Sequence, residues 1–244
     1  VIERMVDAAG VVRGSQVLEV GPGLGSLTLG LLEAGADVVA VEKDPALTEV
    51  LRDVLDARGH TGVRVHRGDA LTVSWRDLLA GGTWKMVSNL PYNVAVPIVL
   101  DLLATAPMVQ ELWVMVQLEV AQRLCAQPGG RTIGVPTIKA AWYSRCRIVM
   151  EVPPEAFTPV PKVTSAVVEM KRCEPPRDDV DVRTTFDLVE SAYRKRRKML
   201  RSSLGDRLRP DAFEAAGIDP TARPEELSVR DWANLSALSG SGAP

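Results

Sequence analysis

Short apolar runs rich in β-branched residues alternate with helical periodicity through the first two-thirds of the chain. These runs predict strands at 17–20, 37–42, 63–66, 86–88 and 112–116. Helical periodicity predicts helices at 26–33 and 45–55. Apolar strands that alternate with helices are typical of a mostly parallel sheet covered on both faces. We therefore expect an α/β fold, in which ligands bind at the carboxyl ends of the strands.

The pattern changes toward the C-terminus. Two further runs, 147–152 and 166–170, predict a late antiparallel hairpin. The stretch 173–179 is polar and carries two prolines, as a linker would. Beyond it only helical patterns follow, at 184–204, near 210–216 and near 229–238. The sequence thus predicts a ligand-binding domain at 1–172 and a small all-α domain at 173–244.

Composition places the chain among ordinary globular proteins. It has 244 residues, of which 46% are hydrophobic and 25% charged. No apolar run reaches the ~18–20 residues that span a bilayer, and no signal segment opens the chain. We therefore expect a cytoplasmic protein without a membrane partner, and a monomer by default. His60 and His66 are the two histidines, and no metal-ligand spacing surrounds them, so we expect no metal.

Positive charge is concentrated in one short stretch, although the net charge of the chain is only −2. Between positions 194 and 209 the single acid is Asp206. The cations with which we associate RNA binding are Arg194, Lys195, Arg196, Arg197, Lys198 and Arg201. Such a run is either a solvated helix face or a surface that binds phosphates.

A glycine-rich loop follows the first predicted strand, in Glu19-Val20-Gly21-Pro22-Gly23-Leu24-Gly25. Glycines let the backbone turn tightly and approach a ligand closely. The spacing G-x-G-x-G differs from the G-x-G-x-x-G of dinucleotide-binding proteins, and Pro22 lacks an N–H that a pyrophosphate could use. The loop therefore favours a ligand without phosphates over a nicotinamide nucleotide.

Acidic residues stand at the ends of the next two strands. Glu42 is placed to accept hydrogen bonds from both ribose hydroxyls. Asp69 could accept one from an adenine amine, although alone it could also be a helix cap. Together with the loop these positions describe a nucleoside-type cofactor. The predicted cofactor site comprises Glu19, Gly21, Gly23, Glu42, Lys43, Asp69 and Ala70.

The tetrapeptide Asn89-Leu90-Pro91-Tyr92 follows the fourth predicted strand. Adenine N6 is a poor nucleophile because its lone pair is delocalised into the ring. The Asn89 Oδ1 atom and the Leu90 carbonyl could accept both N6–H bonds and so leave the lone pair directed at a methyl group. Pro91 would stiffen the turn, and Tyr92 could stack on the base. Without the upstream cofactor loop, an ordinary turn that caps a helix would be the better interpretation of this tetrapeptide.

At these residues the chain resembles the ribosomal RNA adenine N6,N6-dimethyltransferase family, the enzymes associated with kasugamycin sensitivity. Further similar segments extend the resemblance over essentially the whole chain, at 115–121, 152–163, 165–168, 196–204, 218–220 and 223–228. The resemblance implies a Rossmann-like core that uses S-adenosyl-L-methionine, followed by a helical C-terminal domain that binds RNA. It also implies dimethylation of two adjacent adenines in a hairpin near the 3′ end of small-subunit (16S) rRNA, within an immature 30S-type subunit.

Carried over residue by residue, the resemblance makes Gly21, Glu42, Asp69 and Asn89 cofactor contacts, with Asn89 shared with catalysis. It pairs Tyr92 with Phe157 around the target adenine, although Phe157 could instead be a core aromatic. The family normally begins with a basic segment that contains Gly-Gln-Asn-Phe and closes over the cofactor. The sequence starts just after that motif, and we expect a trimmed N-terminus.

Three other interpretations of the sequence remain. Macrolide-resistance rRNA methyltransferases, which act on the large subunit, share the core and a similar Asn-x-Pro-Tyr motif; the segments 157–162 and 218–228 favour the small-subunit enzymes. A non-catalytic ribosome-assembly factor would not need the complete cofactor set. A small-molecule methyltransferase would not need the basic stretch.

Overall fold

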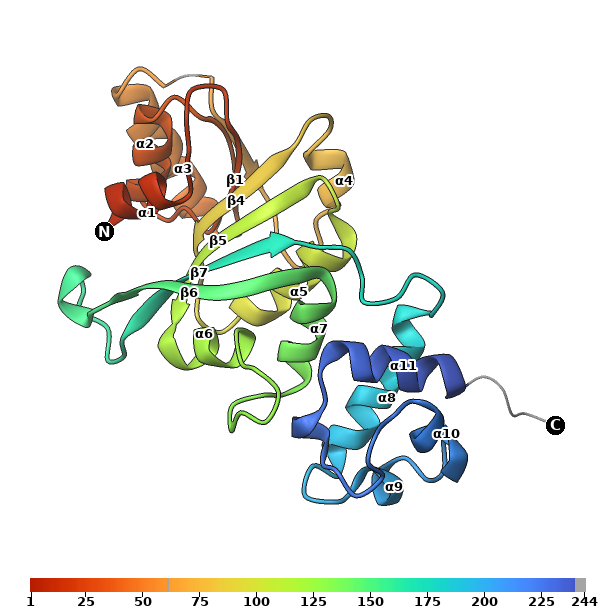
Figure 1. The fold of residues 1–244 in the computed structure, drawn as a ribbon. Helices are drawn as coiled ribbons and strands as arrows, with labels where there is room; N and C mark the ends of the chain where they lie inside the picture. The colour runs from red at the N-terminus through yellow and green to blue at the C-terminus, as the bar shows by residue number, and fades with distance from the viewer. Residues whose placement is uncertain (61, 240–244) are drawn as a thin grey trace. The chain divides into compact units, whose positions relative to one another are not determined.

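The computed structural model describes residues 1–60 and 62–239 (Figure 1). The chain forms two compact units: Val1–Ala121 with Arg145–Arg172, and Gln122–Ser144 with the residues from Cys173 onward. The sequence predicted that the chain passes from the first domain to the second once, after residue 172. In the structure an earlier segment, 122–144, also belongs to the second unit, and we call this segment the excursion. The last five residues of the predicted second domain lie outside the described residues.

A seven-stranded sheet forms the centre of the first unit, with the order β3-β2-β1-β4-β5-β7-β6. Strands β1 to β5 pair in parallel, and β7 runs antiparallel to β5. The predicted α/β fold and the late hairpin are therefore confirmed. The strands are β1 (Gln16–Val20), β2 (Asp37–Glu42), β3 (Arg64–Arg67), β4 (Trp84–Asn89), β5 (Val109–Gln117), β6 (Ser144–Val152) and β7 (Ser165–Arg172).

Helices cover both faces of this sheet because the strand residues that point to each face are apolar. On one face, α1 and α2 pack against Val17, Val87 and Val167. On the other face the alternate residues Leu18 and Met86 are also fully buried. The helices of this part of the chain are α1 (Ile2–Ala8), α2 (Ser26–Glu33), α3 (Pro45–Ala57), α4 (Trp75–Leu78), α5 (Ala95–Thr105) and α6 (Leu118–Leu124).

The second unit is helical and has its own core. Ile133 and Ile138, from the excursion, are buried in it beside Leu188 and Trp232, which explains why that segment leaves the first unit. Its helices are α7 (Val135–Tyr143), α8 (Val182–Arg194), α9 (Leu200–Ser203), α10 (Pro210–Ala215) and α11 (Val229–Ser239). Among the described residues, no helix has both the length and the apolar character to cross a bilayer.

The helix predicted at 184–204 is broken, and that prediction was wrong. Helix α8 ends at Arg194, and Lys195 leaves helical geometry with φ −115° and ψ 38°. After the break, Leu200 N donates to Ala222 O (2.8 Å) and Arg201 N to Pro220 O (3.0 Å), so the chain is bound to a distant loop. Like charges three and four residues apart also disfavour a continuous helix through this run.

Candidate functional site

The predicted cofactor and catalytic residues converge on one edge of the sheet. Gly21 follows β1, Glu42 ends β2, Asp69 follows β3 and Asn89 ends β4. Since these strands are parallel, their carboxyl ends lie at the same edge. The strand order reverses between β1 and β4, which is where open α/β sheets bind ligands. We call Gly21, Glu42, Asp69 and the segment 89–92 the strand-end site.

The glycine loop depends on backbone conformations that other residues rarely adopt. Gly21, Gly23 and Gly25 have φ values of 70°, 56° and 86°. A Cβ on Gly21 would lie 3.2 Å from Pro91 Cδ, so the loop packs directly against the Asn89–Tyr92 segment. A Cβ on Gly23 would have no atom within 4 Å, which leaves the middle of the loop open to a ligand.

Two buried carboxyl groups lie beneath this loop. Glu42 Oε1 accepts from Asp44 N (2.9 Å) and Oε2 from Gly23 N (3.4 Å), so the acid at the end of β2 also supports the loop. Each of its oxygens retains acceptor capacity for a ligand. Glu19 is 1% exposed, and its Oε2 has no hydrogen-bond partner. Burial, together with the negative charge of Glu42, raises the pKa of Glu19 to about 8.

Asp69 is ionised, and each of its carboxylate oxygens has one partner within the protein. Lys43 Nζ lies 2.8 Å from its Oδ2, and Leu71 N donates to its Oδ1 (3.0 Å). The bond from Lys43 and that from the Leu71 amide lower the pKa of Asp69. The Lys43 side chain is 75% exposed, so this ion pair is open to solvent. Lys43, predicted as a cofactor contact, therefore contacts Asp69 here.

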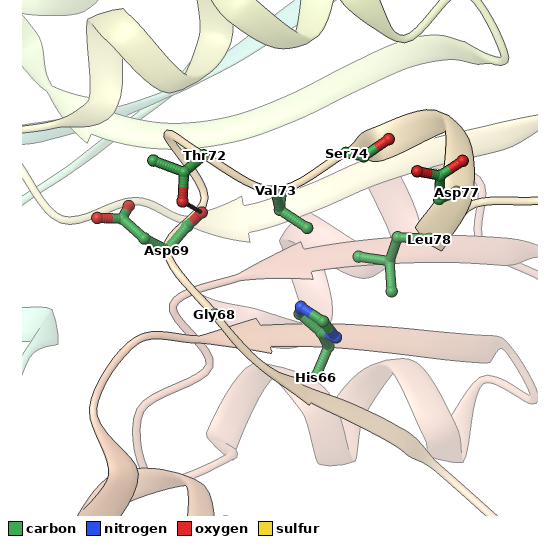
Figure 2. A pocket seen from close by; sticks show the side chains of 8 residues that line it. All are labelled: His66, Gly68, Asp69, Thr72, Val73, Ser74, Asp77 and Leu78. Carbon is green, nitrogen blue, oxygen red and sulfur yellow. Dashed lines mark hydrogen bonds between the residues drawn. The ribbon is translucent and has the colours of Figure 1, made fainter.

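A pocket of about 470 Å³ opens beside Asp69, between β3 and α4. Its lining residues are His66, Gly68, Asp69, Thr72, Val73, Ser74, Asp77 and Leu78. Figure 2 shows the Asp69 carboxylate directed away from His66, at one end of this pocket. The neighbouring Ala70 is buried.

The segment from Asn89 to Tyr92 is held by hydrogen bonds to β5 and to β7. Leu90 is 1% exposed, and its N–H donates to Met115 O (3.1 Å) in β5. A hydrogen bond of 2.8 Å joins Tyr92 Oη to Ser165 Oγ at the start of β7. Asn89 is exposed, and its side-chain amide has no intramolecular hydrogen bond within the described residues. Its amide oxygen is therefore available to a ligand.

A cavity of about 280 Å³ lies over this segment. It is lined by Asn89, Leu90, Pro91, Tyr92, Phe157, Thr158, Pro159 and Pro161. Tyr92 and Phe157, which were predicted to flank the target adenine, thus line the same cavity. Phe157 also packs against the core of the first unit. It therefore both lines the cavity and contacts the core, the two positions considered for it from the sequence.

The predicted RNA-binding cations form an exposed turn in the second unit. We call residues 194–201 the basic turn. All six predicted cations in it are exposed. Arg196 donates to Arg131 O (2.9 Å) and pairs with Glu225 (3.5 Å). Within the described chain the other five form no ion pair, which leaves their charges available to an anionic partner.

Two buried serines contribute to the site and were assigned no role from the sequence. Ser88 Oγ accepts from Val20 N (2.8 Å) and joins the ends of β4 and β1. Ser165 bonds Tyr92 across 73 positions of sequence. Both are completely buried. A serine within an otherwise apolar strand is the one available signal, because a buried hydroxyl requires a partner.

The sequence matches a family described as ribosomal RNA adenine dimethylase over residues 1–239. The ribosomal RNA small subunit methyltransferase A of Nocardia farcinica is 49% identical over 247 residues, which cover 97% of this chain and 84% of that protein. The protein of the same name from Kineococcus radiotolerans is 43% identical, with 99% of this chain and 82% of that protein covered.

Solved structures show the same fold. A dimethyladenosine transferase from Plasmodium falciparum has a TM-score of 0.79 at 21% identity, with 96% of this chain and 93% of that chain covered. The 23S rRNA methyltransferase ErmE has a TM-score of 0.74 at 26% identity, with 98% and 96% covered. The match along almost the whole sequence, with relatives this similar, identifies the family. The chain belongs to the ribosomal RNA adenine dimethylase family.

Proposed function

We propose that the protein transfers methyl groups from S-adenosyl-L-methionine to N6 of two adjacent adenines in a hairpin near the 3′ end of small-subunit rRNA. The observation that carries this proposal is the Asn89 amide, which lines a cavity and has no intramolecular hydrogen bond within the described residues. The segment that contains Asn89 packs against the glycine loop. Relatives at 43–49% identity bear the name small subunit methyltransferase A.

The residues at the strand ends fit the proposed cofactor. The open space at Gly23 accepts a close ligand, and the absence of an N–H at Pro22 suits a ligand without phosphates. Glu42 has acceptor capacity for ribose hydroxyls, and Asp69 has it for an adenine amine. Glu19 Oε2, which has no hydrogen-bond partner, is available to a polar group of the ligand. When bound, the cofactor supplies an electrophilic methyl group on a sulfonium.

The Asn89–Tyr92 segment then orients the nucleophile. Asn89 Oδ1 and the Leu90 carbonyl accept the two N6–H bonds of a flipped adenine, which directs the nitrogen lone pair out of the hydrogen-bonded plane. The rings of Tyr92 and Phe157 hold the base, with stacking worth ~1–3 kcal/mol per base. Much of the rate comes from this orientation, because a positioned reactant no longer loses translational freedom in the reaction.

The basic turn serves the RNA partner in this proposal. Its unpaired cations bind rRNA phosphates of an immature small subunit, which gives affinity without base recognition. The protein then acts as a monomer in the cytoplasm. The identity to ErmE, 26%, is lower than the 43–49% identity to the relatives named small subunit methyltransferase A, and this difference favours the small subunit over the large one.

The test is methylation of unmethylated small subunits by Asn89→Ala and Asn89→Asp. Loss of one oriented hydrogen-bonding group typically costs about 10²–10³ in kcat, and we expect that loss for Asn89→Ala. Asn89→Asp keeps the acceptor oxygen and retains more activity than Asn89→Ala. RNA affinity and thermal stability serve as the controls, and both stay unchanged. Full activity of Asn89→Ala would sink the catalytic assignment.

A further inference from the structure

Tyr92 is bonded to a residue that lies outside the proposed catalytic segment. Its hydroxyl group and that of Ser165 are 2.8 Å apart. Ser165 is the first residue of β7 and pairs in register with Gln117, the last residue of β5. The backbone there is fixed by the sheet, and the carbonyl of the preceding residue, Thr164, accepts a hydrogen bond from Leu118 N (2.9 Å). Ser165 is therefore a rigid anchor.

Ser165 is a polar residue at the start of a strand whose next three residues are apolar. It is 0% exposed, as are Ala166, Val167 and Val168. A buried hydroxyl group without a partner is costly, so burial at this position requires the bond that Tyr92 provides. Tyr92 is only half-buried, and its ring lines the cavity proposed for the target adenine. The hydroxyl end of that ring is fixed by the core, while its face remains available to a base.

We propose that Ser165 is a positioning residue for the methyl transfer, which acts by fixing the Tyr92 ring before the adenine enters. It does not touch the substrate. A ring fixed in advance does not lose rotational freedom when the base stacks on it, so more of the stacking energy reaches the reacting geometry. This inference rests on the proposed function, because it requires that Tyr92 stacks on the target base.

A double-mutant cycle with Ser165→Ala and Tyr92→Phe tests the proposal. Either change removes the same hydrogen bond, and we expect each to lower kcat by about 3- to 10-fold, the value of one such bond. The double variant should lose no more than the worse single variant, because the bond is already absent. Cofactor affinity stays unchanged in all three. Losses that multiply in the double variant would overturn the proposal.

A spectroscopic readout separates positioning from general stability. In an rRNA hairpin with 2-aminopurine at the target position, stacking on Tyr92 quenches the fluorescence of the flipped base. Ser165→Ala and Tyr92→Phe should both weaken this quenching. The matched control is Ser144→Ala, which removes a buried serine hydroxyl that bonds Ala140 O (2.9 Å). It should leave quenching and kcat unchanged, and an equal effect of Ser144→Ala and Ser165→Ala would refute the positioning role.

The outcomes distinguish this inference from the function on which it rests. If Asn89→Ala and Tyr92→Ala keep full activity, the proposed function itself fails. If those variants lose activity but Tyr92→Phe keeps normal kcat and quenching, only the positioning role fails. Tyr92→Phe breaks the bond from the half-buried side, so the test does not depend on the folding of Ser165→Ala.

Discussion

The strand-end site and the basic turn differ in what holds their side chains. In the strand-end site, the segment 89–92 is tied to β5 through Leu90 and to β7 through Tyr92, and Gly21 packs against Pro91. In the basic turn the cations are exposed, and five of the six form no ion pair within the described chain. One region is built on buried hydrogen bonds, and the other presents charge to solvent.

The difference fits the roles proposed for the two regions. An exocyclic amine must meet its hydrogen-bond acceptors at fixed distances and angles, so a small displacement costs rate. Phosphate binding depends on the number and density of charges and releases counterions, so it tolerates mobile side chains. Substitutions in the basic turn should therefore change affinity and its salt dependence, whereas substitutions in the strand-end site should change turnover or cofactor binding.

Among the variants that follow, removal of charge in the basic turn should have the largest effect. In the triple variant Lys195→Gln, Arg197→Gln, Lys198→Gln, the slope of log affinity against log salt should fall by about 2 to 3, because each lost phosphate contact removes ~0.7–0.9. A fourfold rise in salt would then cost about 20- to 60-fold less affinity than in the unchanged protein. Filter binding across salt concentrations measures this, and kcat at saturating RNA should not change.

A matched control is the triple variant Arg13→Gln, Arg52→Gln, Arg58→Gln in the first unit. It changes the net charge by the same amount at exposed positions. We expect little change in the salt slope. The comparison between the two regions breaks down if both triple variants lower the slope equally, since overall charge would then explain the binding.

Gly21→Ala tests the precision of the strand-end site. A residue with a Cβ at φ 70° costs roughly 1–2 kcal/mol, and here the Cβ also meets Pro91. We expect cofactor affinity, measured by calorimetry, to fall by about 5- to 30-fold. Gly14→Ala shares a positive φ of 80° but has no atom within 4 Å, so it should lower stability without changing that affinity. Equal affinity losses in both variants would show that backbone strain, and not the contact with Pro91, causes the loss.

The last effect is one on stability rather than on binding, and it concerns the buried Glu19 and pH. Its pKa is about 8 in the folded protein against 4.5 for the free side chain, so the folded state retains a proton that the unfolded state releases. The free energy of unfolding should therefore fall as pH rises from about 4.5 to 8, by at most about 1.4 kcal/mol per pH unit from this group. Above pH 8 its contribution is constant.

Denaturation with urea at several pH values, compared with Glu19→Gln, measures this contribution. Glu19→Gln should flatten the pH dependence in that window, while Glu49→Gln, at an exposed position of α3, should preserve it. An unchanged pH dependence in Glu19→Gln would show that the Glu19 proton is not linked to folding.

Local sequence patterns were enough to predict that the residues of the strand-end site lie together, because parallel strands bring their carboxyl ends to one edge. Gly21, Glu42, Asp69 and Asn89 are far apart in sequence, yet each follows or ends a recognisable apolar run. The pairing of Tyr92 with Ser165 could not be predicted in this way. It depends on the antiparallel placement of β7 beside β5, and no local pattern specifies which hydroxyl groups meet.

The second unit shows a further case in which sequence patterns alone do not predict the structure. Apolar periodicity continues from α8 through Leu200 and Leu204, so the sequence predicts one helix. Backbone bonds from Leu200 and Arg201 to the loop at 220–222 break it, and these are tertiary interactions. The excursion at 122–144 is similar, because Ile133 and Ile138 look like core residues without indicating which core they enter.

The most direct test of the central claim is mass-spectrometric mapping of methylated adenines. Unmethylated small subunits and large subunits would be incubated separately with the protein and S-adenosyl-L-methionine, and their rRNA digested and sequenced by mass. We predict N6,N6-dimethylation of two adjacent adenines in the 3′-end hairpin of small-subunit rRNA, and none in large-subunit rRNA. Modification confined to large-subunit rRNA, or no modification of either, would contradict the account.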